Sequence, residues 1–192
     1  KLAGLTTSSD AAERAYLMRI SQAADEYAQK FDRYMQLIER GVALRTRMQE
    51  AAQVSREEFE FIELDMYDAV RVLRLEGDRL KGSDPLTVAE ATSGLTKQIL
   101  DMRTLENVYV ANRSDEAATS WSDLHGNVTT IGSNLKIWLN DDQKASMDKA
   151  LAELDQYRLA FDEFRQNRSE RLALEQSMAQ QSEVVIAAAD EA

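Results

Sequence analysis

The side chains of this sequence that are best suited to bind a small molecule are arginines at positions predicted to face the interior of helices. Arg45 projects within about 20° of the direction of Tyr16 when successive helical residues are turned by about 100°. It therefore stands in the apolar stripe, where a core residue is expected. Arg103 follows Ile99 by one helical turn and lies toward the same side. A guanidinium group that faces a core needs an anion, and it holds a carboxylate through paired hydrogen bonds.

Acidic and aromatic neighbours complete this candidate site for a small carboxylate. Glu106 is nearer than Arg103 to the centre of their stripe, and Arg165 and Arg168 project close to the line of Phe161. The candidate ligand-binding residues are Arg45, Arg103, Glu106, Trp121, Arg165, Arg168 and Glu175.

Counting about 1.5 Å of rise per residue from each predicted turn places these polar groups at two levels. Arg45 is predicted to lie level with Trp121, and Arg103 level with residues 172–175. The alternative interpretation is that each arginine pairs with a glutamate of the same chain or extends to the surface.

The residues needed for enzyme chemistry are not assembled in this sequence. His125 is the only histidine, cysteine is absent, and no Glu-x-x-His pair or glycine-rich phosphate loop occurs. We therefore predict no enzyme activity, no metal and no cofactor. His125 lies at the edge of an apolar side, next to Trp121 by one turn, and is predicted to be a partly buried packing residue.

The composition indicates an acidic helical protein. Of 192 residues, 30% are charged and the formal net charge is −11, so the surface repels phosphates and a nucleic-acid partner is not expected. The sequence contains one proline and seven glycines, which favours helix throughout. No run of about 18 apolar residues is present, so no transmembrane helix is predicted within the sequence.

Apolar residues at helical spacing predict an all-α, elongated antiparallel bundle. A first helix should run over 10–76 and end at the glycines and single proline of 77–85. A second arm over 86–139, with a kink near 112–115, and a third over 142–192 should follow. The apolar stripes are broad and include charges, which suggests that a fourth arm is missing.

Short segments between residues 95 and 165 follow the pattern of a known family. They read Ile99-Leu100-Asp101-Met102-Arg103, Tyr109-Val110-Ala111-Asn112, Asn134-Leu135-Lys136, Tyr157-Arg158 and Phe164-Arg165, with a weaker match through Tyr27, Arg45 and Met48. This pattern resembles the helical bimodular sensor domain found in the periplasmic part of bacterial chemoreceptors and some sensor kinases.

The resemblance implies two four-helix bundles, stacked end to end and sharing long helices. It implies a single periplasmic sensor region over 1–192. A membrane-proximal module would comprise about 55–112 with 166–192, and a membrane-distal module about 10–54 with 113–165. Small organic acids bind within the modules of the family, and Arg103 occupies the place of a ligand-binding arginine. Glu175 falls where the family can place another ligand arginine, and the family's first arm has no counterpart here.

The implied function is that of the ligand-sensing extracytoplasmic domain of a transmembrane chemoreceptor in the inner membrane. Such a domain would bind a small organic acid between helices, form a homodimer and pass a helix shift to the cytoplasm. The alternative is a structural or protein-interaction rod of the spectrin or coiled-coil kind, which would have surface partners and no small-molecule pocket.

Overall fold

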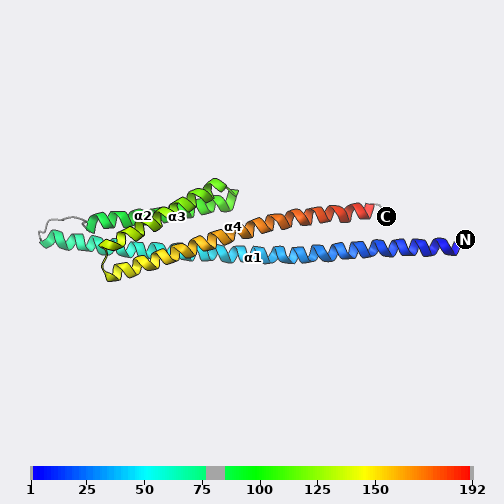
Figure 1. Cartoon of the computed structure of the whole chain (residues 1–192), viewed down its shortest axis with the longest axis horizontal. Helices are drawn as coiled ribbons and strands as arrows, with labels where there is room; N and C mark the ends of the chain where they lie inside the picture. The colour runs from blue at the N-terminus through cyan, green and yellow to red at the C-terminus, as the bar shows by residue number, and fades with distance from the viewer. Residues whose placement is uncertain (1, 77–84, 191–192) are drawn as a thin grey trace. The chain divides into compact units, whose positions relative to one another are not determined.

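The structure is all-α, as the composition and periodicity predict. The computed structural model describes the backbone of residues 2–76 and 85–190, and the side chains of residues 15, 18–73 and 85–186. Its elements are α1 (Leu2–Glu76), α2 (Pro85–Asn112), α3 (Asp115–Leu135), the 3-10 helix η1 (Lys136–Trp138) and α4 (Asp141–Asp190), as labelled in Figure 1. The predicted turn at 77–84 lies outside the described residues. α1 begins at Leu2 and not near residue 10, because residues 2–9 contain no proline that would stop a helix.

Local side-chain hydrogen bonds fix the points at which the later helices begin. Pro85 is the first residue of α2, a position where its missing N–H costs nothing. The Ser114 hydroxyl accepts a hydrogen bond of 3.1 Å from the Ala117 amide at the start of α3. Asn140 and Gln143 form a reciprocal pair before α4, with hydrogen bonds of 2.9 and 3.0 Å. These caps satisfy amide groups that have no partner inside a helix.

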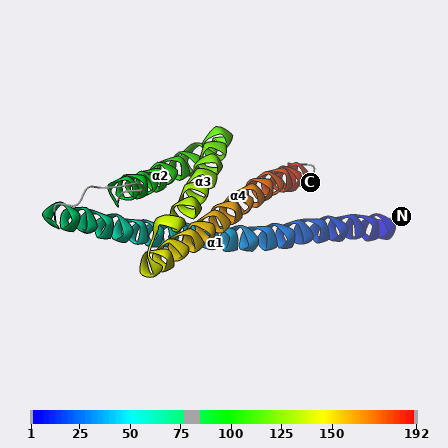
Figure 2. The same ribbon diagram turned by 60° about the vertical axis from the view of Figure 1, so that its left-hand side comes forward.

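The chain reverses direction between α2 and α3. Arg113 has a φ of 58°, and its amide donates to the Tyr109 carbonyl at 2.9 Å, which is the αL form of helix termination. α3 then returns along α2, and the two helices lie side by side in Figures 1 and 2, joined by a 2.7 Å hydrogen bond from Asn127 to Gln98. The predicted single arm over 86–139 is therefore wrong, because the expected kink is a complete turn.

The chain divides into two compact units. Residues 44–163 form one, which we call the four-helix unit, and residues 1–43 with 164–192 form the other, the two-helix unit. The predicted grouping of 55–112 with 166–192, and of 10–54 with 113–165, differs from this division. The reversal at Arg113 is the reason, because it returns α3 to α2 within one unit.

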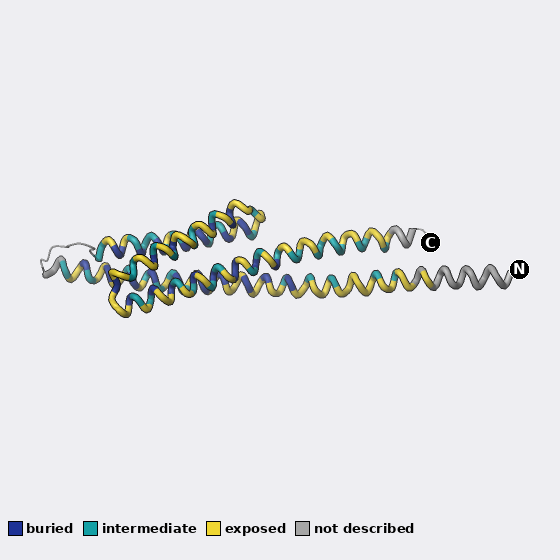
Figure 3. Tube along the Cα trace, in the orientation of Figure 1, coloured by how far each residue is buried: buried dark blue, intermediate teal, exposed yellow. Residues whose placement is uncertain are grey.

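The core of the four-helix unit is made by the second part of α1, by α2 and α3, and by the first part of α4. Figure 3 shows the buried positions of these segments in dark blue. The largest fully buried side chains of this unit are Met48, Phe59, Ile62, Leu95, Ile99, Met102, Trp121, Met147, Leu154, Tyr157 and Phe161. Ser55 donates to the Ala150 carbonyl at 2.9 Å and so joins α1 to α4 inside this core. A Cβ at Gly132 would lie 3.0 Å from Leu151, so the glycine permits close packing of α3 on α4.

The two-helix unit is an antiparallel pair formed by the start of α1 and the end of α4. Buried Asn167 donates to the Leu37 carbonyl at 3.0 Å, and Tyr34 donates to Glu175 at 2.9 Å. Most of its described side chains are exposed or half-buried. A four-helix module in this part of the chain remains a prediction, because the described residues supply two helices.

Candidate ligand-binding site

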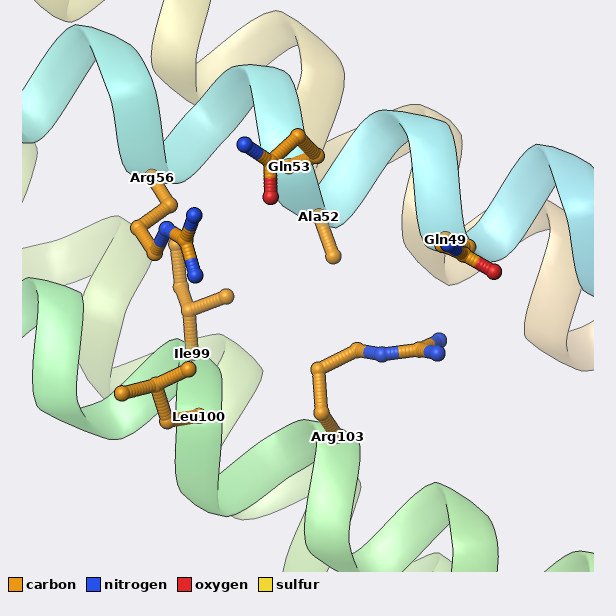
Figure 4. A pocket seen from close by; sticks show the side chains of 7 residues that line it. All are labelled: Gln49, Ala52, Gln53, Arg56, Ile99, Leu100 and Arg103. Atoms are coloured by element: carbon orange, nitrogen blue, oxygen red, sulfur yellow. The ribbon is translucent and has the colours of Figure 1, made fainter.

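A pocket of about 340 Å³ lies between α1 and α2 within the four-helix unit. It is lined by Gln49, Ala52, Gln53 and Arg56 of α1 and by Ile99, Leu100 and Arg103 of α2 (Figure 4). Helical geometry explains this set, because residues spaced by three, four and seven positions share one face of a helix. The α1 residues have this spacing, and Ile99 and Arg103 of α2 are one turn apart.

The pocket combines an apolar floor with two cations. Ala52 and Ile99 are buried, and they separate the site from the core behind it. Figure 4 shows that Arg56 and Arg103 reach from opposite helices into the space between α1 and α2. The side chains of Arg56 and Arg103 are 31% and 25% exposed, so both are partly buried. Partial burial strengthens the interaction of such guanidinium groups with a nearby negative charge.

Arg103 also belongs to a buried polar link that leads to α4. Its Nη1 donates to Glu106 Oε2, and the carboxylate of Glu106 is only 1% exposed. The Tyr157 hydroxyl donates to the same oxygen at 2.6 Å. Burial raises the pKa of Tyr157, and the nearby charge of Glu106 raises it further, so the phenol keeps its proton and remains a donor. Glu106 faces the interior, as predicted, and Arg103 pairs with a glutamate of the same chain, as in the alternative interpretation of the arginines.

Aromatic rings surround this link inside the four-helix unit. The ring of Trp121 lies 4.9 Å from that of Tyr157 and 4.5 Å from that of Phe161, measured between centroids. His125 stacks on Trp121 at 5.7 Å, and burial lowers the pKa of this imidazole, with the charge of Arg158 adding to the effect. His125 is a packing residue, as predicted. Trp121 is a core residue and does not line the pocket.

The prediction that Arg45 faces the interior is wrong. Arg45 is exposed, and its neighbour Leu44 is buried in its place. The projection from Tyr16 spans about four heptads, and a packed helix departs from a straight 100° projection by about 20° per heptad. The accumulated error of about 80° is close to the turn of about 100° per helical residue, so Leu44 faces the core where Arg45 was expected.

The other three candidates, Arg165, Arg168 and Glu175, lie in the two-helix unit. Glu175 accepts the hydrogen bond from Tyr34 and lies 4.0 Å from Arg171, so it has partners within the same chain. The predicted level of Arg103 beside residues 172–175 is wrong, because the α4 residue that it meets is Tyr157, whose ring centroid lies 6.0 Å from the guanidinium carbon.

Sequence reasoning missed Arg56, Gln49 and Gln53. Arg56 had a readable signal, because it follows Ala52 by four residues and precedes Phe59 by three, and both of these are buried. No comparable signal marked the glutamines, which lie at the exposed edge of the same face.

The fold and this site place the chain among all-α bundle domains that carry a cationic pocket between two helices. Among the described residues, no helix is long and apolar enough to cross a bilayer, and no cluster of acidic or histidine side chains could hold a metal ion. The sequence matches the family of the helical bimodular sensor domain over residues 2–191, and the chain belongs to this family. This is a family of extracellular sensor domains and not one of enzymes. A comparison with curated proteins gives no match.

Proposed function

We propose that this chain is the ligand-sensing periplasmic domain of an inner-membrane chemoreceptor, and that it binds a small carboxylate in the pocket between α1 and α2. The observation that carries the proposal is the pair of partly buried arginines, Arg56 and Arg103, above the floor formed by Ala52 and Ile99. Membership of a sensor family supports the reading as a receptor domain.

The two arginines differ in how readily they can engage a ligand. Arg56 Nε lies 3.2 Å from Glu60, and these side chains are 31% and 46% exposed. An ion pair with this much contact with water contributes little, so a ligand carboxylate can replace Glu60, which then remains hydrated. Arg103 keeps its bond to buried Glu106 and offers its remaining N–H groups to the ligand.

A path for the signal follows from the same contacts. Arg103 of α2 holds Glu106, and Glu106 holds Tyr157 of α4. A ligand that draws Arg103 toward α1 changes this link and favours a different position of α4 relative to its neighbours. A ligand shifts the equilibrium between two arrangements only by the difference in its affinity for them.

A thermal-shift screen of small organic acids, amino acids and amines tests this proposal. A ligand present at a hundredfold excess over its Kd stabilises the folded domain by about 2.7 kcal/mol. We expect such a shift with an acid, and we expect it to be lost in Arg56→Ala and in Arg103→Ala, each compared with its own ligand-free baseline. Arg47→Ala is the matched control, because Arg47 is an exposed arginine of α1 that donates to Gln156 outside the pocket.

Two results would count against the proposal. The absence of a shift with every acid would favour the alternative of a structural or interaction rod. A shift that survives in both pocket variants would place the acid elsewhere on the chain. Arg56→Ala is the safer variant for this purpose, because it removes only a half-buried ion pair and leaves Glu106 with its partners.

We further propose that the partner of the chain is a second copy of itself, packed on the two-helix unit. Tyr27, Phe31 and Met35 recur at one-turn spacing along α1 and are all exposed. Apolar stripes of this kind mark interaction surfaces. Sedimentation velocity should show a dimer that Phe31→Asp converts to a monomer. A wild-type monomer at every concentration would contradict the proposal.

A further inference from the structure

One polar group at the edge of the pocket has its orientation fixed by a neighbour. The Gln53 side chain contacts Glu57, with Nε2 2.5 Å from Glu57 Oε1. A carboxylate at neutral pH only accepts hydrogen bonds, so the group that faces Glu57 must be the amide nitrogen. The amide oxygen of Gln53 is therefore turned away from Glu57, and Figure 4 shows it directed into the space between α1 and α2. The pocket thus presents a neutral acceptor beside its cations.

The charges around the pocket limit how much negative charge a ligand can bring. Arg103 is neutralised by Glu106, and this pair cannot separate cheaply because Glu106 is 1% exposed. Arg56 can be released, since the Glu60 side chain is 46% exposed and water can replace the arginine there. The pocket can therefore match one negative charge with Arg56, whereas a second carboxylate would face an arginine that is already paired.

The apolar floor separates the cationic groups from one another. Ala52 and Ile99 are buried and offer only methyl and methylene groups to the pocket. A short carbon chain can lie over this floor, with a charged end at an arginine and a polar end at Gln53. The Gln53 oxygen can accept a hydrogen bond from a neutral donor. A cationic donor such as an ammonium group is disfavoured, because the adjacent arginines repel it.

From these contacts we infer that the pocket takes a small monocarboxylate that also carries a hydroxyl group, with Gln53 as the residue that selects for the hydroxyl. The inference rests on the proposed function, and it narrows the ligand from carboxylates in general to singly charged hydroxy acids. The hydroxyl donates to Gln53 Oε1, and the carboxylate accepts hydrogen bonds from Arg56, which stands on the same helix as Gln53.

Isothermal titration calorimetry with three sets of acids tests this inference. Glycolate, lactate and 3-hydroxybutyrate are compared with acetate, propionate and butyrate, which lack the hydroxyl, and with malate and succinate, which carry a second carboxylate. We expect the best hydroxy acid to bind about five- to tenfold more tightly than its unsubstituted counterpart, the usual effect of one hydrogen bond. In Gln53→Leu this ratio should fall to about one, because leucine offers no acceptor to the hydroxyl group.

Gln166→Leu is the control for the substitution. Gln166 makes the same kind of contact as Gln53, a hydrogen bond of 3.3 Å to the glutamate four residues later. It is also exposed, but it lies in the two-helix unit, away from the pocket lining. It should leave the hydroxyl preference intact.

The outcomes separate this inference from the proposed function. Tighter binding of the diacids, or a hydroxyl preference that persists in Gln53→Leu, would overturn the inference and leave a carboxylate sensor standing. Failure of every acid to bind would overturn both. A hydroxyl preference that is lost in Gln53→Leu and retained in Gln166→Leu supports both.

Discussion

The hydrogen bond from Tyr157 to Glu106 should be a large local contribution to the stability of the four-helix unit, and Tyr157→Phe tests it. Glu106 is 1% exposed and accepts from Tyr157 at 2.6 Å and from Arg103. Water cannot reach the carboxylate to replace the phenol, and a hydrogen bond to a charged group contributes about 1.5–3 kcal/mol. We therefore expect Tyr157→Phe to lower the free energy of unfolding by about 2 kcal/mol.

Trp121 can report the expected decrease in the free energy of unfolding of the four-helix unit. Its ring lies 4.9 Å from that of Tyr157 in the same core, so its fluorescence should report unfolding of the four-helix unit during a urea titration. For a chain of this length a change of about 2 kcal/mol corresponds to a decrease in Tm of about 4–8 °C. Tyr67→Phe is the control, because Tyr67 is exposed on α1, and it should change the free energy by less than about 0.5 kcal/mol.

A double-mutant cycle with Glu106→Gln determines whether the effect belongs to this bond. If the reasoning is right, Tyr157→Phe should cost clearly less once the carboxylate has been replaced, with a coupling energy of about 1–2 kcal/mol. A decrease below about 0.5 kcal/mol in the single variant, or additive effects in the cycle, would refute the account of Glu106 as a buried charge held by Tyr157.

Two further predictions follow from the turn and from the histidine. Arg113 has a φ of 58°, so Arg113→Gly should raise the free energy of unfolding by about 0.5–1 kcal/mol in urea unfolding, and a decrease would contradict the left-handed turn. Burial lowers the pKa of His125 below its usual 6.5, so on acidification the unfolded chain takes up the proton first. The contribution of neutral His125 to the free energy of unfolding is therefore fully present above about pH 6.5. It is lost as the pH falls toward the lower pKa of the folded state. His125→Gln should flatten the change in stability between about pH 7.5 and about pH 5.5, and an unchanged slope would exclude His125 as its source.

The sequence predicts the helices of this protein better than their connections. Apolar spacing and the scarcity of proline are enough to identify the long helices, because both act locally along the chain. The reversal at Arg113 was mistaken for a kink, because a left-handed turn is usually marked by glycine and here an arginine adopts it. This turn matters for the packing of α3, since it decides whether α3 continues past α2 or returns beside it.

The candidate site shows the same limit at the level of side chains. The pairing of Arg103 with Glu106 could be put forward as an alternative interpretation, because two residues three positions apart share one face of a helix without any tertiary information. Arg45 was misplaced because its orientation was projected from a distant residue, and Arg56 was missed although buried Ala52 and Phe59 flank it at helical spacing. The link to Tyr157 could not be predicted, because it depends on how α2 and α4 are aligned in the bundle.

The position of Glu106 argues that the pair with Arg103 serves the pocket as well as the core. Ile99 and Met102 surround it on α2 and are fully buried, so an apolar residue at position 106 would continue the same packing. A buried ion pair is often no more stabilising than such a residue, so stability alone does not explain the charges. A role in orienting Arg103 explains the charges, because Glu106 holds one edge of the Arg103 guanidinium and leaves its other edge directed at the pocket. Tyr157 then fixes the carboxylate from α4, so that Arg103 of the pocket is also tied to the helix proposed to carry the signal.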